Sequence, residues 1–191
     1  MLDQPRFHVI TRRLHGLIAI LIPTQLLIGA LMNPPHPGAP VDPLFLLHKV
    51  LGLLTAATLL AFFAWACLRR TDTPLGQLFP WFGTARKQAW AECKGLLHNL
   101  RHGHLPEPQA ITRFVSAVHG AGLLLALGMG ATGTVLWLLA VAHTSSGFVP
   151  LVADVHRALA SLMWAYLVGH GLMALIHHGL GHGTLSRMFM P

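Results

Sequence analysis

Apolar residues are gathered along this chain into four long runs, which are separated by polar, proline-rich or basic segments. A helix needs about 20 apolar residues to cross the hydrocarbon core of a bilayer, and each run is long enough to do so. The sequence therefore predicts an all-α integral membrane protein. We expect a single four-helix bundle domain over residues 1–191, with spans at about 14–32, 44–68, 114–142 and 151–176.

Composition agrees with a membrane protein. The chain is 53% hydrophobic and 10% charged, whereas roughly a quarter of the residues of a soluble domain are charged. Its net charge of +7 would suggest nucleic acid in a soluble protein, but the bases cluster at one membrane face, so we expect no nucleic-acid partner. Cys67 and Cys93 form neither a CxxC nor a CxxCH motif. The sequence thus argues against a disulfide scaffold, a zinc ribbon and covalent c-type haem.

Basic residues predict the orientation of the spans. Eleven of the thirteen Lys and Arg lie in the N-terminal arm, the connection between the second and third spans, and the C-terminal tail. Only Lys49 and Arg157 lie near the opposite face. By the positive-inside rule, both termini are expected in the cytoplasm.

The connection over residues 69–112 is long enough to fold on its own. Its apolar residues recur at helical spacing with Lys and Arg between them, which predicts an amphipathic helix. Such a helix either lies on the cytoplasmic leaflet or forms a docking surface for a soluble partner subunit. The apolar positions are Ala89, Trp90, Cys93, Leu96, Leu97 and Leu100.

Four of the fourteen histidines fall inside predicted spans in complementary positions. Buried histidines in a membrane are costly without a partner, so each is a functional candidate. His170 follows fourteen residues after His156, which is within about 40° of four full turns and a rise of about 21 Å. Both then face the same way at opposite membrane levels. We expect His15 to meet His170 at the cytoplasmic level and His48 to meet His156 at the outer level.

Two imidazoles that face each other across a bundle are the ligand set of a six-coordinate b-type haem. Two pairs predict two haems b, with His15, His48, His156 and His170 as the iron ligands. For any one histidine, the alternative is an interhelical hydrogen bond. Nearby glycines would leave room for the macrocycle, although they equally suit plain helix packing. These glycines are Gly16, Gly52, Gly169 and Gly171.

Basic residues beside the ligands suit the haem propionates. They are Arg13 and its neighbour Arg12, Lys49 and Arg157. For Lys49 and Arg157, the alternative is contact with lipid headgroups.

Three further features have open interpretations. His119, in the third span, either replaces His15 as a haem ligand or lines a quinone or proton site. Gln25, after Pro23, makes either a helix–helix hydrogen bond or a quinone contact. The spacing of His98, His102 and His104 weakly suits zinc.

The chain resembles the bacterial cytochrome b561 family, whose domain type is shared by the cytochrome b subunits of nickel-iron hydrogenases. The resemblance implies a four-helix membrane protein with two haems b that exchanges electrons with membrane quinone. The family's ligand positions match His15, His48, His156 and His170. The likeness is carried by R-R-L-H at Arg12–His15, L-H-K-x-x-G at Leu47–Gly52, V-H-G…T-G over Val118–Gly133, the pair His156 and His170, and the tail motif His177–Met188.

Two departures from the family pattern affect the functional expectation. Gly16 stands where the family often has tryptophan, which should reshape the haem edge, and the 69–112 connection is longer than in compact members. We expect a quinone-linked di-haem oxidoreductase that carries electrons between an outer-face or periplasmic partner, with superoxide as one possibility, and ubiquinone or menaquinone. The runner-up is a membrane-anchor cytochrome b subunit of a hydrogenase or dehydrogenase. A third hypothesis is a haem-free transporter of metal ions or protons.

Overall fold

The computed structural model describes residues 7–35, 40–70, 75–104, 108–142 and 147–181, with residues 185 and 188 of the tail; of residues 108 and 109 only the backbone is described. Arg6 of the basic arm, Arg187 of the basic tail and, in all, five of the twelve residues of the tail motif His177–Met188 lie outside the described residues. The chain divides into two compact units. The first unit comprises Met1–Ala64 and Leu125–Pro191, and the second comprises Trp65–Leu124.

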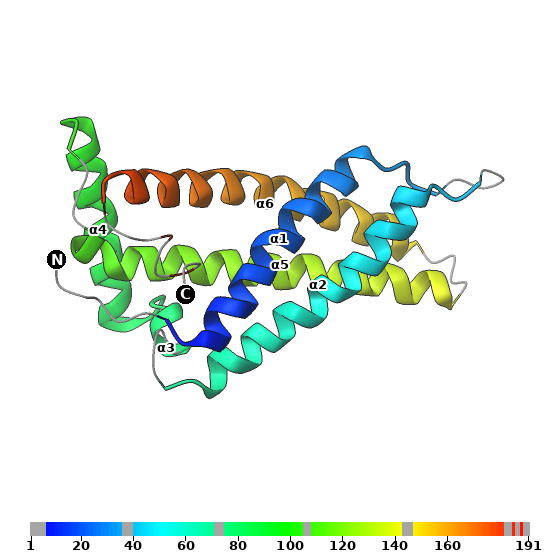
Figure 1. Ribbon diagram of the computed structural model, residues 1–191, viewed down its shortest axis with the longest axis horizontal. Helices are drawn as coiled ribbons and strands as arrows, with labels where there is room; N and C mark the ends of the chain where they lie inside the picture. Colours follow the sequence, from blue (N-terminus) through cyan, green and yellow to red (C-terminus); the bar gives the residue numbers. More distant parts are fainter. Residues whose placement is uncertain are drawn as a thin grey trace. The chain divides into compact units, whose positions relative to one another are not determined.

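The predicted all-α membrane architecture is confirmed. Within the described residues there is no strand, and four helices are long and apolar enough to cross a membrane. Each one covers a predicted span, with ends that differ by a few residues because the helices extend into or stop short of the polar flanks. They are α1 (Val9–Leu31), α2 (Pro43–Leu68), α5 (Thr112–Val141) and α6 (Phe148–Gly179) (Figure 1).

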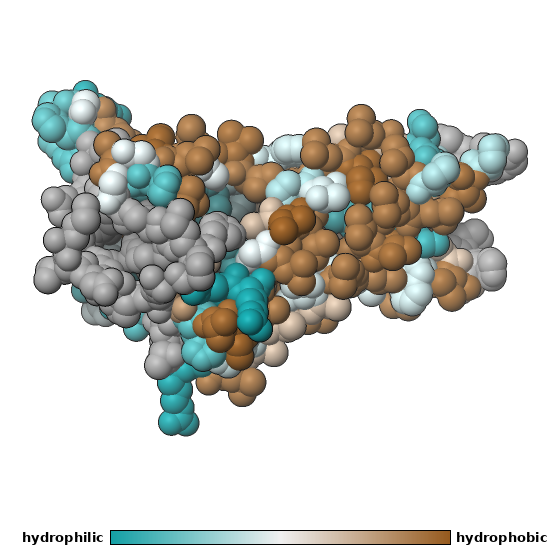
Figure 2. Space-filling view, viewed as in Figure 1, coloured by the Kyte–Doolittle hydropathy of each residue, from teal (hydrophilic) through white to brown (hydrophobic). Residues whose placement is uncertain are grey.

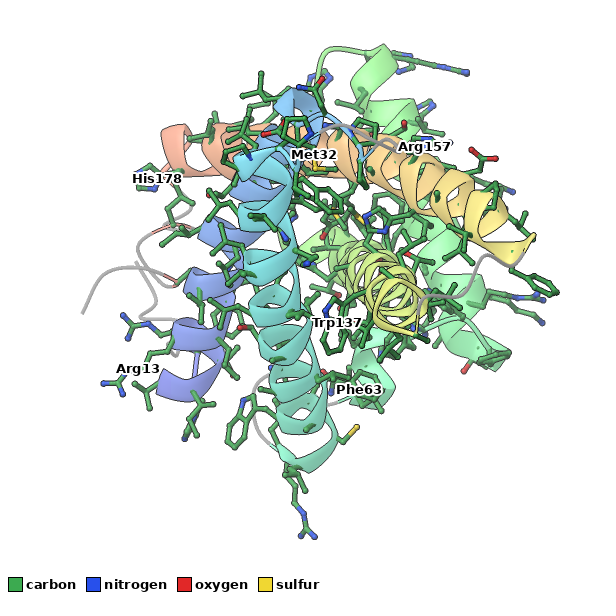
Figure 3. All side chains as sticks on the ribbon, turned by 90° about the vertical axis from the view of Figure 1, so that its right-hand side faces the viewer. Arg13, Met32, Phe63, Trp137, Arg157 and His178 are labelled. Atoms are coloured by element: carbon green, nitrogen blue, oxygen red, sulfur yellow. The ribbon has the colours of Figure 1, made fainter. Side chains whose placement is uncertain are left out.

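Small residues let the helices of the first unit approach closely. A Cβ atom added at Gly130 on α5 would lie 3.3 Å from the Cβ of Ala56 on α2. Viewed along its axis, the C-terminal half of α5 lies between α2 and α6 (Figure 3). Small residues at helix contacts are typical of membrane bundles, where van der Waals packing holds helices together. Leu21, Leu26 and Met163 are buried inside this unit.

The outer surface of the first unit is apolar. Most residues of its long helices are not buried within the chain, and exposed leucines, such as Leu27 on α1 and Leu60 on α2, face outward. Figure 2 shows hydrophobic residues over much of the face that carries α1 and α2. A large exposed apolar surface on ordered helices is what lipid contact requires.

Asp42 closes the connection between α1 and α2. Its carboxylate accepts hydrogen bonds from the backbone N–H of Asn33 at 2.7 Å and of Leu44 at 2.8 Å. The second bond caps the N-terminus of α2. Together with a weaker bond from the Asn33 side chain, these donors hold the pKa of Asp42 below its ordinary value of 3.8. Asp42 thus ties the end of α1 to the start of α2.

The long connection folds into the second unit with α3 (Leu75–Leu78), α4 (Gly83–Arg101) and the short 3₁₀ helix η1 (Pro108–Ile111). A Cβ added at Gly120 on α5 would lie 2.2 Å from the carbonyl oxygen of Leu78, so only glycine permits this contact. The backbone N–H of Phe114 donates to Glu92 at 2.8 Å. The connection is therefore a packed structure around the predicted helix α4.

Candidate functional site

The structure brings together the two histidine pairs that the sequence suggests. All four histidines belong to the first unit. His15 on α1 lies opposite His170 on α6, with ring centroids 6.5 Å apart and ring planes at 58°. His48 on α2 lies opposite His156 on α6, with centroids 6.3 Å apart and planes at 88°. One helix therefore contributes a ring to each pair.

The spacing of the rings fits one metal ion between each pair. A metal–imidazole nitrogen bond is about 2 Å long and a ring centre lies about 1 Å from its nitrogens, so rings on opposite sides of one ion have centroids about 6 Å apart. By comparison, the ring centroids of His98 and His102 lie 4.5 Å apart, which leaves no space for an ion between those two rings. The separations of 6.5 Å and 6.3 Å thus fit one metal ion between the rings of each pair.

Glycines face both rings of the His48/His156 pair. A Cβ added at Gly29 on α1 would lie 3.2 Å from Cε1 of His48, and one at Gly133 on α5 would lie 3.3 Å from Cε1 of His156. Either distance is tighter than an ordinary contact, so a larger residue would push the ring aside. These two positions form a cradle for the pair.

Hydrogen bonding differs between the two rings of this pair. The Oγ1 atom of Thr132 lies 2.8 Å from Nδ1 of His156. The buried Nδ1 of His48 has no hydrogen-bond partner among the described residues. A buried polar nitrogen left without a partner is costly, so the two rings of this pair differ in how firmly hydrogen bonds hold them. The donor set, the spacing and the cradle all fit a haem held by two imidazoles.

The His15/His170 pair has an aromatic neighbour instead. The ring of Tyr166 stacks on that of His170, with centroids 5.3 Å apart and planes at 9°. Tyr166 precedes His170 by one helical turn of α6, so the contact is set by the helix itself. Nδ1 of His15 is buried.

Comparison with known proteins decides the family. The model of the prokaryotic cytochrome b561 family matches residues 6–191, nearly the whole chain. The chain belongs to the prokaryotic cytochrome b561 family. The curated proteins and the solved structures compared with it contain no match.

Membership in the cytochrome b561 family confirms the resemblance seen in the sequence. It makes the chain an integral membrane cytochrome that binds haem b and carries electrons across the membrane. This assignment disfavours the haem-free transporter. Within the described residues, no group of three or more His, Cys, Asp or Glu is placed to hold a metal ion. The weak zinc hypothesis for His98, His102 and His104 therefore gains no support.

The basic residues predicted near the haem propionates lie in different settings. Arg13 is exposed and points outward from α1, on the side away from α2 (Figure 3). Lys49 is half-buried. Arg157 forms an exposed ion pair with Asp154, one turn earlier on α6. Asp154 would thus compete with a haem propionate for Arg157. A contact between a propionate and any of these three side chains stays a prediction.

For Gln25, the predicted helix–helix hydrogen bond is confirmed. Its Nε2 donates to the backbone carbonyl of His48 at 2.9 Å. A Cβ at Gly52 would lie 2.8 Å from this nitrogen. Gly52 therefore leaves room for the Gln25 side chain, and its role beside the macrocycle stays a prediction. The Thr24 hydroxyl bonds within α1, to the carbonyl of Ile20 at 2.8 Å.

The remaining candidates lie in the second unit. Nδ1 of His119 on α5 is 2.8 Å from the carbonyl of Val115 in the same helix. On α4, Trp90 is 61% exposed, and Nζ of Lys94 lies 5.7 Å from its ring centroid. Leu97 and Leu100 are also exposed, whereas Ala89 is buried. The predicted amphipathic helix thus keeps an apolar and basic face outward.

Sequence reasoning missed Gly29, Thr132 and Gly133. A signal was present for the first of them, because Gly29 follows His15 by the same fourteen residues that separate His156 from His170. That spacing places it on the histidine face of α1 at the other level. Thr132 and Gly133 belong to the T-G motif of the resemblance, but their contact with His156 required the packing of α5 on α6.

Proposed function

We propose that the protein is a quinone-linked di-haem cytochrome that moves electrons between a redox partner at the outer membrane face and membrane quinone. The observation that carries the proposal is the occurrence of two histidine pairs, each with ring centroids spaced for one iron between them. A haem with two imidazole ligands supplies one-electron chemistry and has no open iron position. His15 and His170 would hold one haem, and His48 and His156 the other.

Helix α6 sets the relation between the two sites. Because His156 and His170 lie on one continuous helix, their levels are about 21 Å apart along its axis. Met163 lies seven residues from each of them, on the same helix face, and is 1% exposed. A buried apolar side chain thus lies on the histidine face of α6, midway between the two levels.

The orientation follows from the basic residues. We place both termini in the cytoplasm because the arm and the long connection carry most of the Lys and Arg. We place the protein in the bacterial inner membrane because its family is prokaryotic. The His48/His156 pair is then the outer one. We assign to Lys49, which lies next to this pair in sequence, the role of attracting an anionic donor such as superoxide. Arg157 is less suited to it because it is paired with Asp154.

Reaction with quinone tests this function directly. Protein reduced with dithionite is mixed without oxygen with short-chain ubiquinone or menaquinone analogues, and the haem absorption is followed. We expect reoxidation whose rate rises with quinone concentration and then saturates. Reduced bands that persist with both quinones would contradict the quinone assignment.

The outer donor is tested separately. Oxidised protein mixed with superoxide should become reduced, and Lys49→Gln should slow this step without changing quinone reduction. Equal rates for the variant and the unmodified protein would remove Lys49 from the proposal, and no reduction by superoxide would remove superoxide.

The second candidate function is a cytochrome b subunit that accepts electrons from a soluble hydrogenase or dehydrogenase subunit. The outward apolar and basic face of α4 favours it, because such a face suits either an anionic leaflet or a protein partner. Purification from native membranes distinguishes the two. A redox-active subunit that co-purifies and is released by Trp90→Ser would support this function, whereas a protein that is active with quinone when purified alone would support the first one.

A further inference from the structure

The hydroxyl of Thr132 on α5 lies within hydrogen-bond distance of three groups. Its Oγ1 is 2.8 Å from the carbonyl oxygen of Gly128, 3.1 Å from that of Met129, and 2.8 Å from Nδ1 of His156. A hydroxyl has a single proton to donate, and a carbonyl oxygen can only accept. A threonine inside a helix usually donates to the carbonyl one turn earlier, here that of Gly128. With its proton given there, the Thr132 oxygen can accept a hydrogen bond from Nδ1–H of His156.

This arrangement selects one tautomer of His156. With the proton on Nδ1, the Nε2 atom is left with a free lone pair, which is the form of imidazole that binds a metal. Metal-bound histidines commonly have such a partner, which orients the ring and makes it a stronger electron donor.

Gly133, the residue after Thr132, lets the same ring lie close to α5 because it has no side chain. A Cβ at Gly133 would lie 3.3 Å from Cε1 of His156, and Cε1 is the ring atom between the two nitrogens. One residue of α5 thus holds Nδ1 while the next leaves room for the adjoining carbon. The hydrogen bond to Thr132 restricts rotation of the ring about the Cβ–Cγ bond, and Gly133 lets the same edge of the ring lie close to α5.

We propose that Thr132 is a positioning residue for the haem of the His48/His156 pair: it holds His156 with Nε2 available to iron and lowers the reduction potential of that haem. The proposal rests on the proposed function. The potential falls because a hydrogen bond accepted from Nδ1–H increases electron donation by the ring, which stabilises ferric iron.

Other threonines of the long helices provide controls. The hydroxyl of Thr134, two residues further on α5, donates to the carbonyl of Gly130 at 2.7 Å. Thr55 and Thr58 on α2 likewise bond to the carbonyl one turn earlier. These bonds lie within one helix, whereas the contact of Thr132 reaches across to α6. Thr134→Val therefore removes a hydroxyl from the same helix without touching a proposed ligand.

The experiment uses the full-length protein purified in detergent as Thr132→Val, Thr132→Ser and Thr134→Val. Optical redox titration gives the potential of each haem, and low-temperature electron paramagnetic resonance gives the signal of each ferric haem. We expect Thr132→Val to raise one potential and shift one signal while the other haem is unchanged. Thr132→Ser should restore both values, and Thr134→Val should match the unmodified protein. Thr132→Ala should give the same shift, so the test does not depend on the folding of one variant.

Combination with His15→Ala assigns the effect. By the proposed function that variant keeps only the haem of the His48/His156 pair, and Thr132→Val should shift the remaining component. Unchanged potentials and signals in Thr132→Val, or an equal shift in Thr134→Val, would overturn the role of Thr132. If the unmodified protein still binds two haems in that case, the proposed function stands. A protein that binds no haem would overturn both.

Discussion

The two histidine pairs share helix α6 but differ in their surroundings. The His48/His156 pair lies against Gly29 and Gly133 and has one ring bonded to Thr132. In the His15/His170 pair, one ring is stacked against Tyr166. The ring separations are nearly the same, at 6.3 Å and 6.5 Å. The comparison indicates that spacing is set by helix packing, while tautomer and ring orientation are set locally. Two such sites are expected to respond to different substitutions.

The largest expected effect is the loss of one haem. His48→Ala or His156→Ala should remove the haem of that pair and spare the other, and His15→Ala or His170→Ala should do the reverse. A single remaining imidazole binds a bis-histidine haem only weakly. Haem b per polypeptide and the reduced-minus-oxidised spectrum are the measurements. If both haems remain after any one of these changes, that histidine is not a ligand.

A smaller effect is expected at the glycine cradle. Gly29→Ala and Gly133→Ala place a methyl group at 3.2 Å and 3.3 Å from a ring carbon, so the ring must shift by a few tenths of an ångström. We expect the paramagnetic resonance signal of the His48/His156 haem to shift or broaden and the other signal to stay.

Gly95→Ala is the matched control for the cradle variants, because it is a helical glycine of α4 whose added Cβ meets nothing within 4 Å. Identical spectra in the control and in both cradle variants would mean that the glycines do not position the rings.

Tyr166 should affect only the other pair. Tyr166→Leu removes the stacked ring beside His170, a contact of the kind worth about 0.5–1.5 kcal/mol, and we expect a modest change in the signal and retention of the His15/His170 haem. Tyr166→Phe keeps the ring and should behave as the unmodified protein. A change in the His48/His156 haem would show that the two surroundings are not independent.

The smallest effect concerns the loop before His48. Asp42 stabilises the folded state as a carboxylate, and its pKa is lowered first by the backbone N–H of Asn33 and then by that of Leu44. Its contribution is therefore full above a pH of about 4 and is lost as the pH falls through the lowered pKa. We expect Asp42→Ala to lower the melting temperature at pH 7 and to match the unmodified protein at strongly acidic pH.

Asp154→Ala serves as the control for Asp42→Ala, since it removes an exposed ion pair with Arg157 and such pairs contribute little to stability. A difference between Asp42→Ala and the unmodified protein that does not depend on pH would mean that the charge of Asp42 is not the cause.

Hydropathy and periodicity were sufficient to predict the architecture and to place the histidines at two levels. A run such as residues 151–176 identifies a span because the bilayer fixes its length, and the fourteen-residue spacing of His156 and His170 follows from helix geometry alone. Contacts between helices were not predictable in this way. The choice of Gly29 and Gly133 over Gly52 as the cradle depends on how far each helix is rotated about its axis.

The folded connection was only partly predictable. Trp90 and Leu97 mark α4 as amphipathic, but the seating of Leu78 against Gly120 joins residues far apart in sequence and leaves no periodic signal. The bond between Thr132 and His156 is similar, because a threonine inside an apolar helix usually bonds to its own backbone. Which one also reaches a neighbouring helix depends on packing.

The central claim is that the chain binds two haems b, one at each histidine pair. The most direct measurement is a pyridine haemochrome assay on the purified protein, quantified as haem b per polypeptide and accompanied by a dithionite-reduced-minus-oxidised spectrum. The account predicts a value near two. A value near one would leave one pair without its cofactor, and a value near zero would contradict the assignment of these histidines as haem ligands.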